Sequence, residues 1–472
     1  MIKQGVGIRA WRKPIIKVML TKVMTRLEQP TPALPLALFR ISFGLLMLVS
    51  NVRFMLRGWV SEFYVAPQMH FRYLGFGWVR PLPAWGMYAV FGLLCLLSVG
   101  IALGLAYRVS IISFFGLFSY VELLDTTYYL NHYYFICSLS FLLSFLPVQR
   151  ALSLDVYLKR VKPTRYLPIW MLTALRLQLA LVYLFAGVAK LNPDWLWHAQ
   201  PLQIWLRTNT ELPLIGNLFD YTWVAFAMSW GGMLYDLSIP FLLLWSRTRP
   251  LAYLAVIGFH VLTALLFPIG MFPWIMIVAT LVFFSAEDVK GVARALHIPQ
   301  LSKQMTASPT RKTRSSTTTL NRGRYAVLLL FFMFQVMMPL RHLAYPGNVL
   351  WSEEGYRFSW RVMLAEKTGF AMFTVVEHDT DKRWSVFPSD YLMPQQAKQM
   401  AFQADMIWQF AQFLEAEFNA RGHDNISIYA EVHVSMNGRS SQLYIDPEVD
   451  LLQVEHTLRP KEWILPLLAD GI

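Results

Sequence analysis

Lys190 ends an apolar segment, residues 177–189, in which only Gln178 and Tyr183 carry polar side chains. The ammonium group of such a lysine commonly extends to the polar surface of a membrane, a role that involves no chemistry. Alternatively, the amine lies desolvated inside the protein, where its neutral form can accept a proton from a substrate. The second interpretation makes Lys190 a candidate catalytic base.

Further polar residues lie within apolar segments. Tyr183 precedes Lys190 by seven residues, so both side chains share one face of a helix. His260 lies about 10 Å along a helix from the end of its segment, and a histidine at that depth usually has a function or a polar partner. Asp236 is either the partner of a base or a structural acid, and we slightly favour the structural role.

A tyrosine-rich stretch, DTTYYLNHYYF, runs from Asp125 to Phe135 and contains Asn131, His132 and Tyr133. This composition suits a hydrogen-bonding pocket for an aromatic ligand. A belt of tyrosines at the membrane interface explains it equally well. No metal site is expected, because the histidines show neither H-x-x-H nor H-E-x-x-H spacing.

The composition indicates a membrane protein built from helices. The chain is 56% hydrophobic, has a mean hydropathy of +0.40 and is only 15% charged, whereas soluble proteins contain about 25% charged residues. Helices are expected because the bilayer core offers no water to unpaired backbone groups. The basic residues behind the net charge of +13 cluster in short loops between apolar segments, which indicates control of topology and not binding to nucleic acid.

Nine apolar segments are candidates for crossing a bilayer, which takes about 17–25 residues. They lie at 35–57, 84–106, 108–124, 133–148, 168–189, 222–245, 250–267, 271–285 and 324–340. The third, fourth and eighth are short, so we expect them to be tilted, irregular or partly re-entrant. Nine spans place the N-terminus in the cytoplasm together with the basic segments at 1–34, 149–167, 246–249 and 286–323.

We therefore predict a mainly α fold with a basic cytoplasmic segment (1–34), a polytopic helical membrane domain (35–340) and a C-terminal extracytoplasmic α+β domain (341–472). Within the cytoplasmic loop 286–323, the stretch 303–323 is rich in Ser, Thr and Arg. Such a composition is typical of disorder.

Three elements are expected in the α+β domain. Residues 359–377 and 425–436 contain the alternating and β-branched residues that are typical of strands. Residues 394–422 predict an amphipathic helix that stops at Gly422.

Taken together, several stretches resemble the vitamin K-dependent gamma-glutamyl carboxylase family, with a membrane domain of the HTTM type. Those in the apolar part are LFRISFGLLML, YLNHYY, LVYLFAGVAKLNPDW and FHVLTALLFPIGMFPW. Those in the last domain are YRFSW, VSMNGR, YIDPEVDL and WILPLL. They follow in the same order from Leu38 to Leu468, so the set is more specific than any single motif.

The resemblance implies a multi-pass membrane enzyme, a peptidyl-glutamate carboxylase with coupled vitamin K epoxidase activity. Such an enzyme oxidises reduced vitamin K, a menaquinone- or phylloquinone-type hydroquinone, to the 2,3-epoxide with O2. It uses this reaction to add CO2 to glutamyl residues of exported polypeptides. Membrane lipid and a quinone reductase acting in trans are the other partners implied, whereas neither a metal nor nucleic acid is expected.

Within the family's motifs, Lys190 matches the amine that deprotonates the hydroquinone, and His132 matches a histidine that hydrogen-bonds the oxygenated cofactor. The further candidates for binding the cofactor are His260, Tyr183, Asn131 and Tyr133.

The YRFSW stretch resembles part of the family's glutamate-binding region. Trp360, Arg357 and Arg361 are therefore candidates for binding the glutamyl substrate, since an arginine can hold a carboxylate with two hydrogen bonds. Trp360 fits equally well as a buried aromatic residue of a strand.

Two other functions stay open. The chain could oxidise vitamin K or another quinol without carboxylating peptides. It could also be a non-enzymatic quinone-binding or transport protein in which Lys190 is structural. A transporter should contain paired halves with matching broken helices, and we find no such repeat in the sequence.

Overall fold

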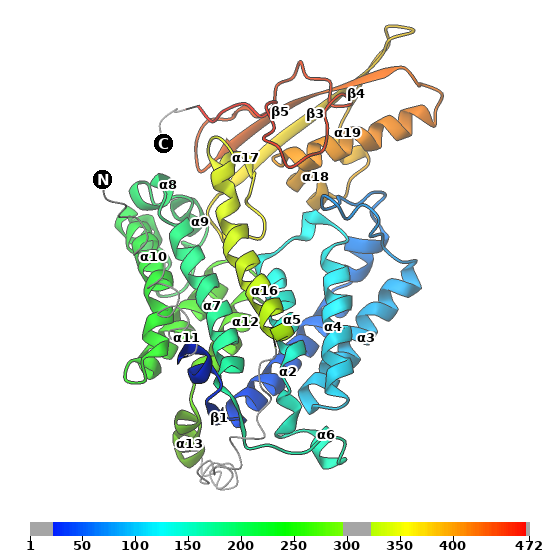
Figure 1. Cartoon of the computed structure of the whole chain (residues 1–472). Helices are drawn as coiled ribbons and strands as arrows, with labels where there is room; N and C mark the ends of the chain where they lie inside the picture. The colour runs from blue at the N-terminus through cyan, green and yellow to red at the C-terminus, as the bar shows by residue number, and fades with distance from the viewer. Residues whose placement is uncertain (1–21, 296–321, 469–472) are drawn as a thin grey trace, which may run out of the picture.

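The computed structural model of the chain describes residues 22–295 and 322–468. A bundle of helices carries an α+β domain on one of its ends (Figure 1). The sequence predicts disorder for the stretch 303–323. Residues 303–321 of this stretch lie outside the described ranges.

Each of the nine predicted apolar segments overlaps a helix of the bundle, with starts that differ by up to two residues in several cases. These helices are α2 (Leu34–Leu56), α3 (Ala84–Leu103), α4 (Tyr107–Glu122), α5 (Asn131–Phe145), α7 (Ile169–Ala189), α10 (Thr222–Leu244), α11 (Arg249–Leu266), α12 (Phe272–Ala279) and α16 (Arg322–Leu340). The segments predicted to be short are short, because α4 has 16 residues, α5 has 15 and α12 has 8.

Among the described residues, six helices are long and apolar enough to cross a membrane. They are α2, α3, α7, α10, α11 and the stretch Gly323–Ala344, which contains most of α16. The prediction of a mainly helical membrane fold is thus confirmed.

The ends of these helices follow from local sequence. Gly104 ends α3 with a φ of +62°, a left-handed conformation in which glycine avoids the steric cost of a Cβ. Pro35, Pro250 and Pro273 lie in the first turns of α2, α11 and α12. Proline is tolerated there because these backbone positions have no hydrogen-bond partner within the helix.

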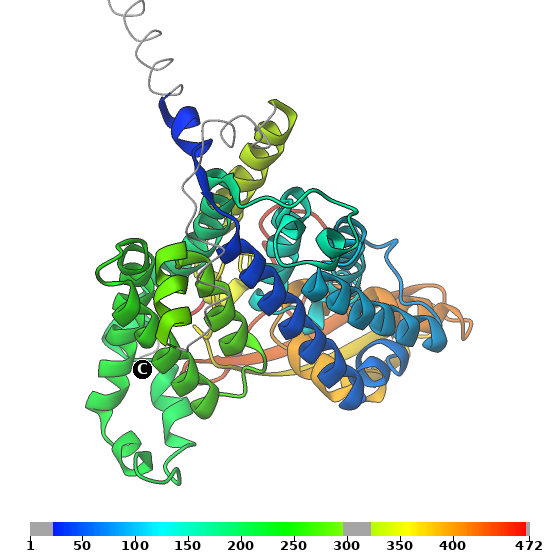
Figure 2. The ribbon, with the colours of Figure 1, turned by 90° about the horizontal axis from the view of Figure 1, so that it is seen from below.

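The bundle consists of two neighbouring groups of helices. Seen from below, α2 to α5 (blue to cyan) form one group, and α10, α11 and α12 (green) form the other (Figure 2). Helix α7 packs closely on α10 at Gly187, where a Cβ would lie only 2.7 Å from a methyl group of Leu237. This close approach brings the end of α7, with Lys190, against the middle of α10.

The α+β domain is a four-stranded antiparallel sheet with two helices on one face. The strand order is β4 (Arg383–Val386), β3 (Lys367–Glu377), β5 (Ile426–Met436) and β6 (Gln442–Leu443). Strands β3 and β5 pair from Lys367–Met436 to Glu377–Ile426. Helices α18 (Pro394–Met400) and α19 (Ala404–Asn419) lie along the sheet, and Phe373 of β3 packs edge-on against Phe410 of α19.

Strand β5 confirms the strand predicted at 425–436, but two other predictions in this domain are wrong in extent. The strand expected from residue 359 begins only at Lys367, because the preceding residues form turns that contact the membrane helices. The helix expected over 394–422 is two helices with a break at 401–403.

This break has a structural reason. It allows the carbonyl oxygen of Ala401 to approach Gly369 of β3, where a Cβ would lie 2.5 Å from that oxygen. It also brings the side chain of Gln403 to Arg357, to which it is hydrogen-bonded. Gly422, with a φ of +89°, follows the end of α19 as predicted.

Candidate functional site

A partly open pocket, whose empty space of about 750 Å³ includes open solvent, lies where the end of α7 meets α10, α11, α12 and a loop of the α+β domain. Val362 and Met363 of that loop form part of its wall. Most of the other lining residues are apolar, and the polar ones are Tyr183, Lys190, Asp236, His260 and Thr263. Three residues selected from the sequence, Lys190, Tyr183 and His260, therefore line one cavity, and both domains contribute to it.

Lys190 has an acidic partner in this cavity. It caps the C-terminus of α7, and its Nζ lies 2.7 Å from Oδ2 of Asp236 on α10 and 3.4 Å from the carbonyl oxygen of Ala186. Each side chain of the pair is only 8% exposed. The indole ring of Trp195 covers the pair from another side, with its centroid 5.3 Å from Nζ. The side chain of Lys190 thus points into the protein.

The Lys190–Asp236 pair can store a proton on either partner. Ammonium with carboxylate and amine with carboxylic acid have the same net charge, but only the first arrangement places two full charges in an apolar cavity. The form with the proton on Asp236 is the one in which Nζ of Lys190 has a lone pair that can accept a proton from a ligand. Accepting one more proton gives the pair a single positive charge, which would stabilise an anion formed next to it.

Asp236 lines the cavity, although the sequence slightly favours a structural role for it and does not select it as a site residue. Its signal was an acidic side chain in the middle of an apolar segment, where an ionisable group is usually paired or functional. The partner lies 46 residues away in the chain. Only the packing of α7 against α10 identifies it.

His260 is the second polar group of the cavity. Its Nε2 lies 3.2 Å from the hydroxyl of Tyr183, which in turn lies 3.5 Å from the hydroxyl of Tyr235. Its Nδ1 is buried and has no hydrogen-bond partner among the described residues. Because buried polar atoms are nearly always paired, a ligand oxygen in the cavity is a suitable partner for Nδ1.

His132 lies one layer of side chains away from the cavity. Its ring is buried, and its centroid is 5.9 Å from that of Phe272, whose opposite contact is His260 at 5.7 Å. Phe272 lines the cavity, whereas His132 does not. The two histidines therefore flank one phenylalanine, and the role expected of His132 stays a prediction.

Asn131 and Tyr133 also lie outside the cavity lining. The amide of Asn131 donates to the carbonyl oxygen of Arg361 at 2.9 Å and accepts from the hydroxyl of Tyr129 at 3.1 Å. Tyr133 packs its ring against those of His132 and Phe118. Asn131 thus connects α5 to the loop that closes the cavity, a contact that the sequence does not reveal.

The loop 356–363 is fixed onto the membrane helices by aromatic side chains. Trp360 is 1% exposed and stacks on Tyr134 of α5, with centroids 4.8 Å apart. The backbone N–H of Phe358 donates to the hydroxyl of Tyr129 at 2.7 Å. Phe358, Trp360 and Met363 all have positive φ angles, between 53° and 61°, which are unfavourable for residues other than glycine. This conformation explains why the segment is not a strand, and it directs Val362 and Met363 to the cavity.

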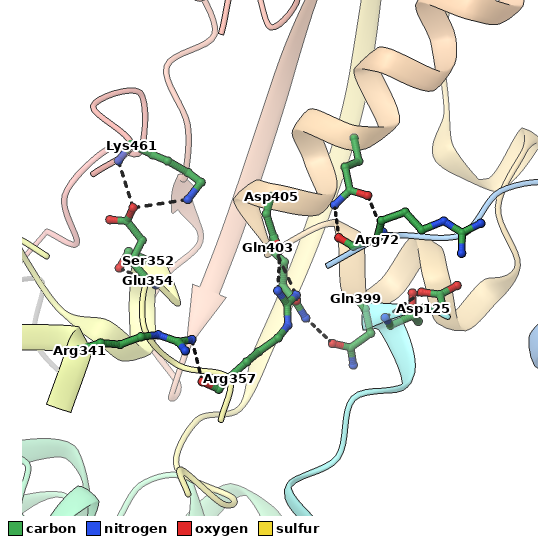
Figure 3. A network of polar contacts seen from close by, with 12 residues as sticks. Arg72, Asp125, Arg341, Ser352, Glu354, Arg357, Gln399, Gln403, Asp405 and Lys461 are labelled. Atoms are coloured by element: carbon green, nitrogen blue, oxygen red, sulfur yellow. Dashed lines mark hydrogen bonds and ion pairs between the residues drawn. The ribbon is translucent and has the colours of Figure 1, made fainter. Parts of the chain in front are cut away.

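The two candidate arginines have different surroundings. Arg357 forms an ion pair with Asp405 at 2.5 Å and a hydrogen bond with Gln403 (Figure 3). Burial lowers the pKa of Arg357, but Asp405 outweighs this effect and raises it above its usual value. Burial likewise opposes the charge of Asp405, and Arg357 holds the pKa of that carboxyl below its usual 3.8. Arg357 is therefore already bound within the α+β domain.

Arg361 has no acidic partner among the residues that the structure describes. Its side chain is buried, and its Nε has no hydrogen-bond partner within the described ranges. Burial lowers the pKa of Arg361 below its usual value, and the neighbouring Tyr356 only partly offsets this effect. Arg361 directly precedes the cavity-lining Val362. A substrate carboxylate would supply the hydrogen-bond acceptors that this guanidinium lacks.

Two family models match the chain. The first, HTTM domain, matches residues 28–287, which contain α2 to α12. The second, vitamin K-dependent gamma-carboxylase, lumenal domain, matches residues 320–470, which contain α16 and the α+β domain. No solved structure matches the chain. The cavity lies at the boundary of the two matched regions, since Val362 and Met363 belong to the second and the other lining residues to the first.

Proposed function

The chain belongs to the vitamin K-dependent gamma-carboxylase family, and on this basis we propose that it is a membrane enzyme that carboxylates glutamyl residues of exported polypeptides. In this proposal the carboxylation is coupled to oxidation of reduced vitamin K to its 2,3-epoxide. The observation that supports this proposal most strongly is the buried Lys190–Asp236 pair. The pair lies in a mostly apolar cavity, and a loop of the α+β domain forms part of the cavity wall.

The cavity residues fit a reduced naphthoquinone. The rings of Phe259, Phe272 and Trp195 would contact its apolar surface, while Lys190 and His260 would bind its oxygen atoms. The unpaired Nδ1 of His260 is a hydrogen-bonding atom for which the described residues offer no partner. When bound, reduced vitamin K supplies, by reaction with O2, a base strong enough to remove a γ-hydrogen from a glutamyl residue, which then takes up CO2.

The protein's own contribution begins with a proton transfer. With the proton of the pair on Asp236, Nζ of Lys190 accepts a proton from a bound hydroxyl group, and the resulting single positive charge stabilises the anion that is left on the ligand. His260 orients the ligand, and Tyr183 fixes the ring of His260 through its Nε2. The apolar walls and the 356–363 loop exclude water, which would quench a strong base and a carbanion.

The decisive experiment uses purified protein with reduced menaquinone, O2, labelled CO2 and a glutamate-rich peptide. We expect both the epoxide and labelled peptide to form. Epoxide without fixed label would instead identify a quinol epoxidase that lacks carboxylation. If neither product forms although the quinone binds, the chain is a quinone-binding protein and the proposal is wrong.

Arg361 is proposed to bind the glutamyl carboxylate. Loss of a charge-assisted hydrogen bond costs about 1.5–3 kcal/mol, so Arg361→Gln should raise the KM for the peptide roughly 10- to 100-fold. Epoxide formation measured without peptide should be unchanged. An unaltered KM would exclude Arg361 from the peptide site.

Arg357→Gln provides the contrast to this variant. It leaves the buried carboxylate of Asp405 without its cation, so we expect a lower unfolding temperature in detergent. In Arg361→Gln the unfolding temperature should be retained, because no carboxylate loses a partner.

The chain is a membrane protein with an extracytoplasmic domain, and we propose that its N-terminus is cytoplasmic. The basic segments at 1–34 and 149–167 support this orientation. A reporter that is active only after export should be active when fused behind Ile472 and inactive when fused before Met1. The opposite pattern would overturn this orientation, and the same result at both ends would overturn an odd number of spans.

A further inference from the structure

A turn between β5 and β6 connects the α+β domain to the lysine site. Its central residues, Asn437 and Gly438, have φ angles of +53° and +82°, and Arg439 N–H donates to the carbonyl oxygen of Met436 at 3.1 Å. Two successive positive φ angles are the geometry that an Asn-Gly pair adopts most readily. The turn presents the side chains of Asn437 and Arg439 to the membrane domain.

Both side chains bind Asp194, which lies in the short helix α8 (Pro193–Trp197) that follows Lys190. The Arg439 guanidinium forms two hydrogen bonds with the carboxylate, at 2.7 and 2.8 Å, and Asn437 Nδ2 forms a third at 2.7 Å. Burial opposes the charge of Asp194, but these donors hold the pKa of its carboxyl below 3.8. Oδ1 of Asn437 accepts from the backbone N–H of Glu366 at 2.9 Å, so the turn is itself fixed to its domain.

The residue after Asp194 forms part of the lysine site. Trp195 lines the cavity, and the centroid of its ring lies 5.3 Å from Nζ of Lys190. Its indole N–H donates to the carbonyl oxygen of Ser229 on α10 at 2.8 Å, and the Ser229 hydroxyl donates to the carbonyl oxygen of Trp195. Helix α8 is therefore held by α10 on one side and by the Asn437–Arg439 turn on the other.

We propose that Arg439, together with Asn437, is a positioning element that holds Trp195 over the Lys190–Asp236 pair by binding Asp194. Without Arg439, the buried carboxylate of Asp194 loses its cation and becomes costly to bury. Helix α8 then moves to hydrate this carboxylate, and Trp195 moves with it. Water then reaches the lysine site, so docking of the α+β domain determines whether the site is dry. The effect on turnover rests on the proposed function, whereas the positional link does not.

Hydrogen exchange tests the positional link without any substrate. In Arg439→Gln, backbone amides of residues 194–197 should exchange about thirtyfold faster than in the wild type, because one partner of a buried charged pair is lost. The matched control is Gln409→Ala, which removes a different contact between the domains, the hydrogen bonds of 2.6 and 3.1 Å to the backbone of Arg72. The control should leave exchange at 194–197 unchanged. Unchanged exchange in Arg439→Gln would overturn the proposal.

A second variant separates positioning from misfolding. In Asp194→Asn/Arg439→Gln neither charge remains buried, so protection of 194–197 should return toward the wild-type level. If protection stays low in this double variant while the protein remains monodisperse, the Asp194–Arg439 contact is not the link and the proposal is wrong.

A double-mutant cycle on epoxide formation tests whether Arg439 acts through Trp195. Arg439→Gln should reduce kcat about tenfold in the wild-type background, and much less in Trp195→Phe, because groups that act through one another are not additive. Gln409→Ala should keep the wild-type kcat. Equal effects of Arg439→Gln in both backgrounds would show that Arg439 does not act through Trp195. If the wild type forms no epoxide, the proposed function fails, but the exchange experiment still decides the positional link.

Discussion

Lys190→Met should abolish epoxide formation and glutamyl carboxylation together. In the proposed function both reactions depend on the first proton transfer to Nζ, and a positioned acid or base contributes about 10²–10⁴-fold to a rate. Asp236 should not take over this role, because a carboxyl group left alone in the apolar cavity is most stable in its protonated form, which accepts no further proton. The measurement is the initial rate of epoxide formation and of CO2 fixation, determined separately for the same preparation.

Lys398→Met is the matched control, since Lys398 is exposed on α18 and its replacement should change neither rate. A loss of only twofold in Lys190→Met would mean that the lysine is structural. Near-normal epoxide formation with loss of carboxylation would show that Lys190 serves the peptide half-reaction instead. Either outcome would contradict the role proposed here.

The stability of the Lys190–Asp236 pair gives the second large effect. Removing one partner of a buried ion pair typically costs about 3–5 kcal/mol, because the other charge stays buried and uncompensated. Lys190→Met and Asp236→Leu should therefore each lower the unfolding temperature in detergent. Lys190→Met/Asp236→Leu should recover most of this loss, since the double variant buries no charge at this position, but it should remain inactive.

This double variant also separates catalysis from folding. A stable protein without activity shows that the pair is retained for chemistry and not for stability. Additive destabilisation by the two substitutions would mean that the side chains do not interact as the 2.7 Å distance implies. Recovery of epoxide formation in the double variant would exclude Lys190 as the base.

The sequence by itself determined the class of protein and most of its elements. Nine apolar segments predicted nine helices, including the short ones at 108–124, 133–148 and 271–285. These predictions hold because a bilayer offers no water to backbone polar groups. A run of consecutive apolar residues must therefore pair its own backbone groups, and it does so by forming a helix. The same reasoning selected Lys190 and His260, since ionisable side chains within apolar segments are expensive without a function or a partner.

Recognition of the family also required only the sequence. The motifs from LFRISFGLLML to WILPLL are short and contiguous, and the family models match the two regions in which they lie. Motifs of this kind identify a family, but they do not reveal which of their side chains are in contact in the folded protein.

The tertiary structure alone decided the partners. It paired Lys190 with Asp236 and placed Phe272 between His132 and His260. It also bound Arg357 to Asp405 while leaving Arg361, four residues later, without a carboxylate partner among the described residues. Arg357 lies within YRFSW and Arg361 directly follows it, and no pattern in the sequence distinguishes their surroundings.

The physical reason is that helix formation depends on neighbours in the chain, whereas partner choice depends on which helices pack together. Gly187 permits the close contact of α7 with α10 that brings Asp236 to Lys190. The turns at 356–363 exist because Trp360 stacks on Tyr134 of a distant helix, against the strand tendency of the local sequence. Such contacts join residues that are far apart in the chain, so they arise only when distant helices, or the two domains, have packed against one another.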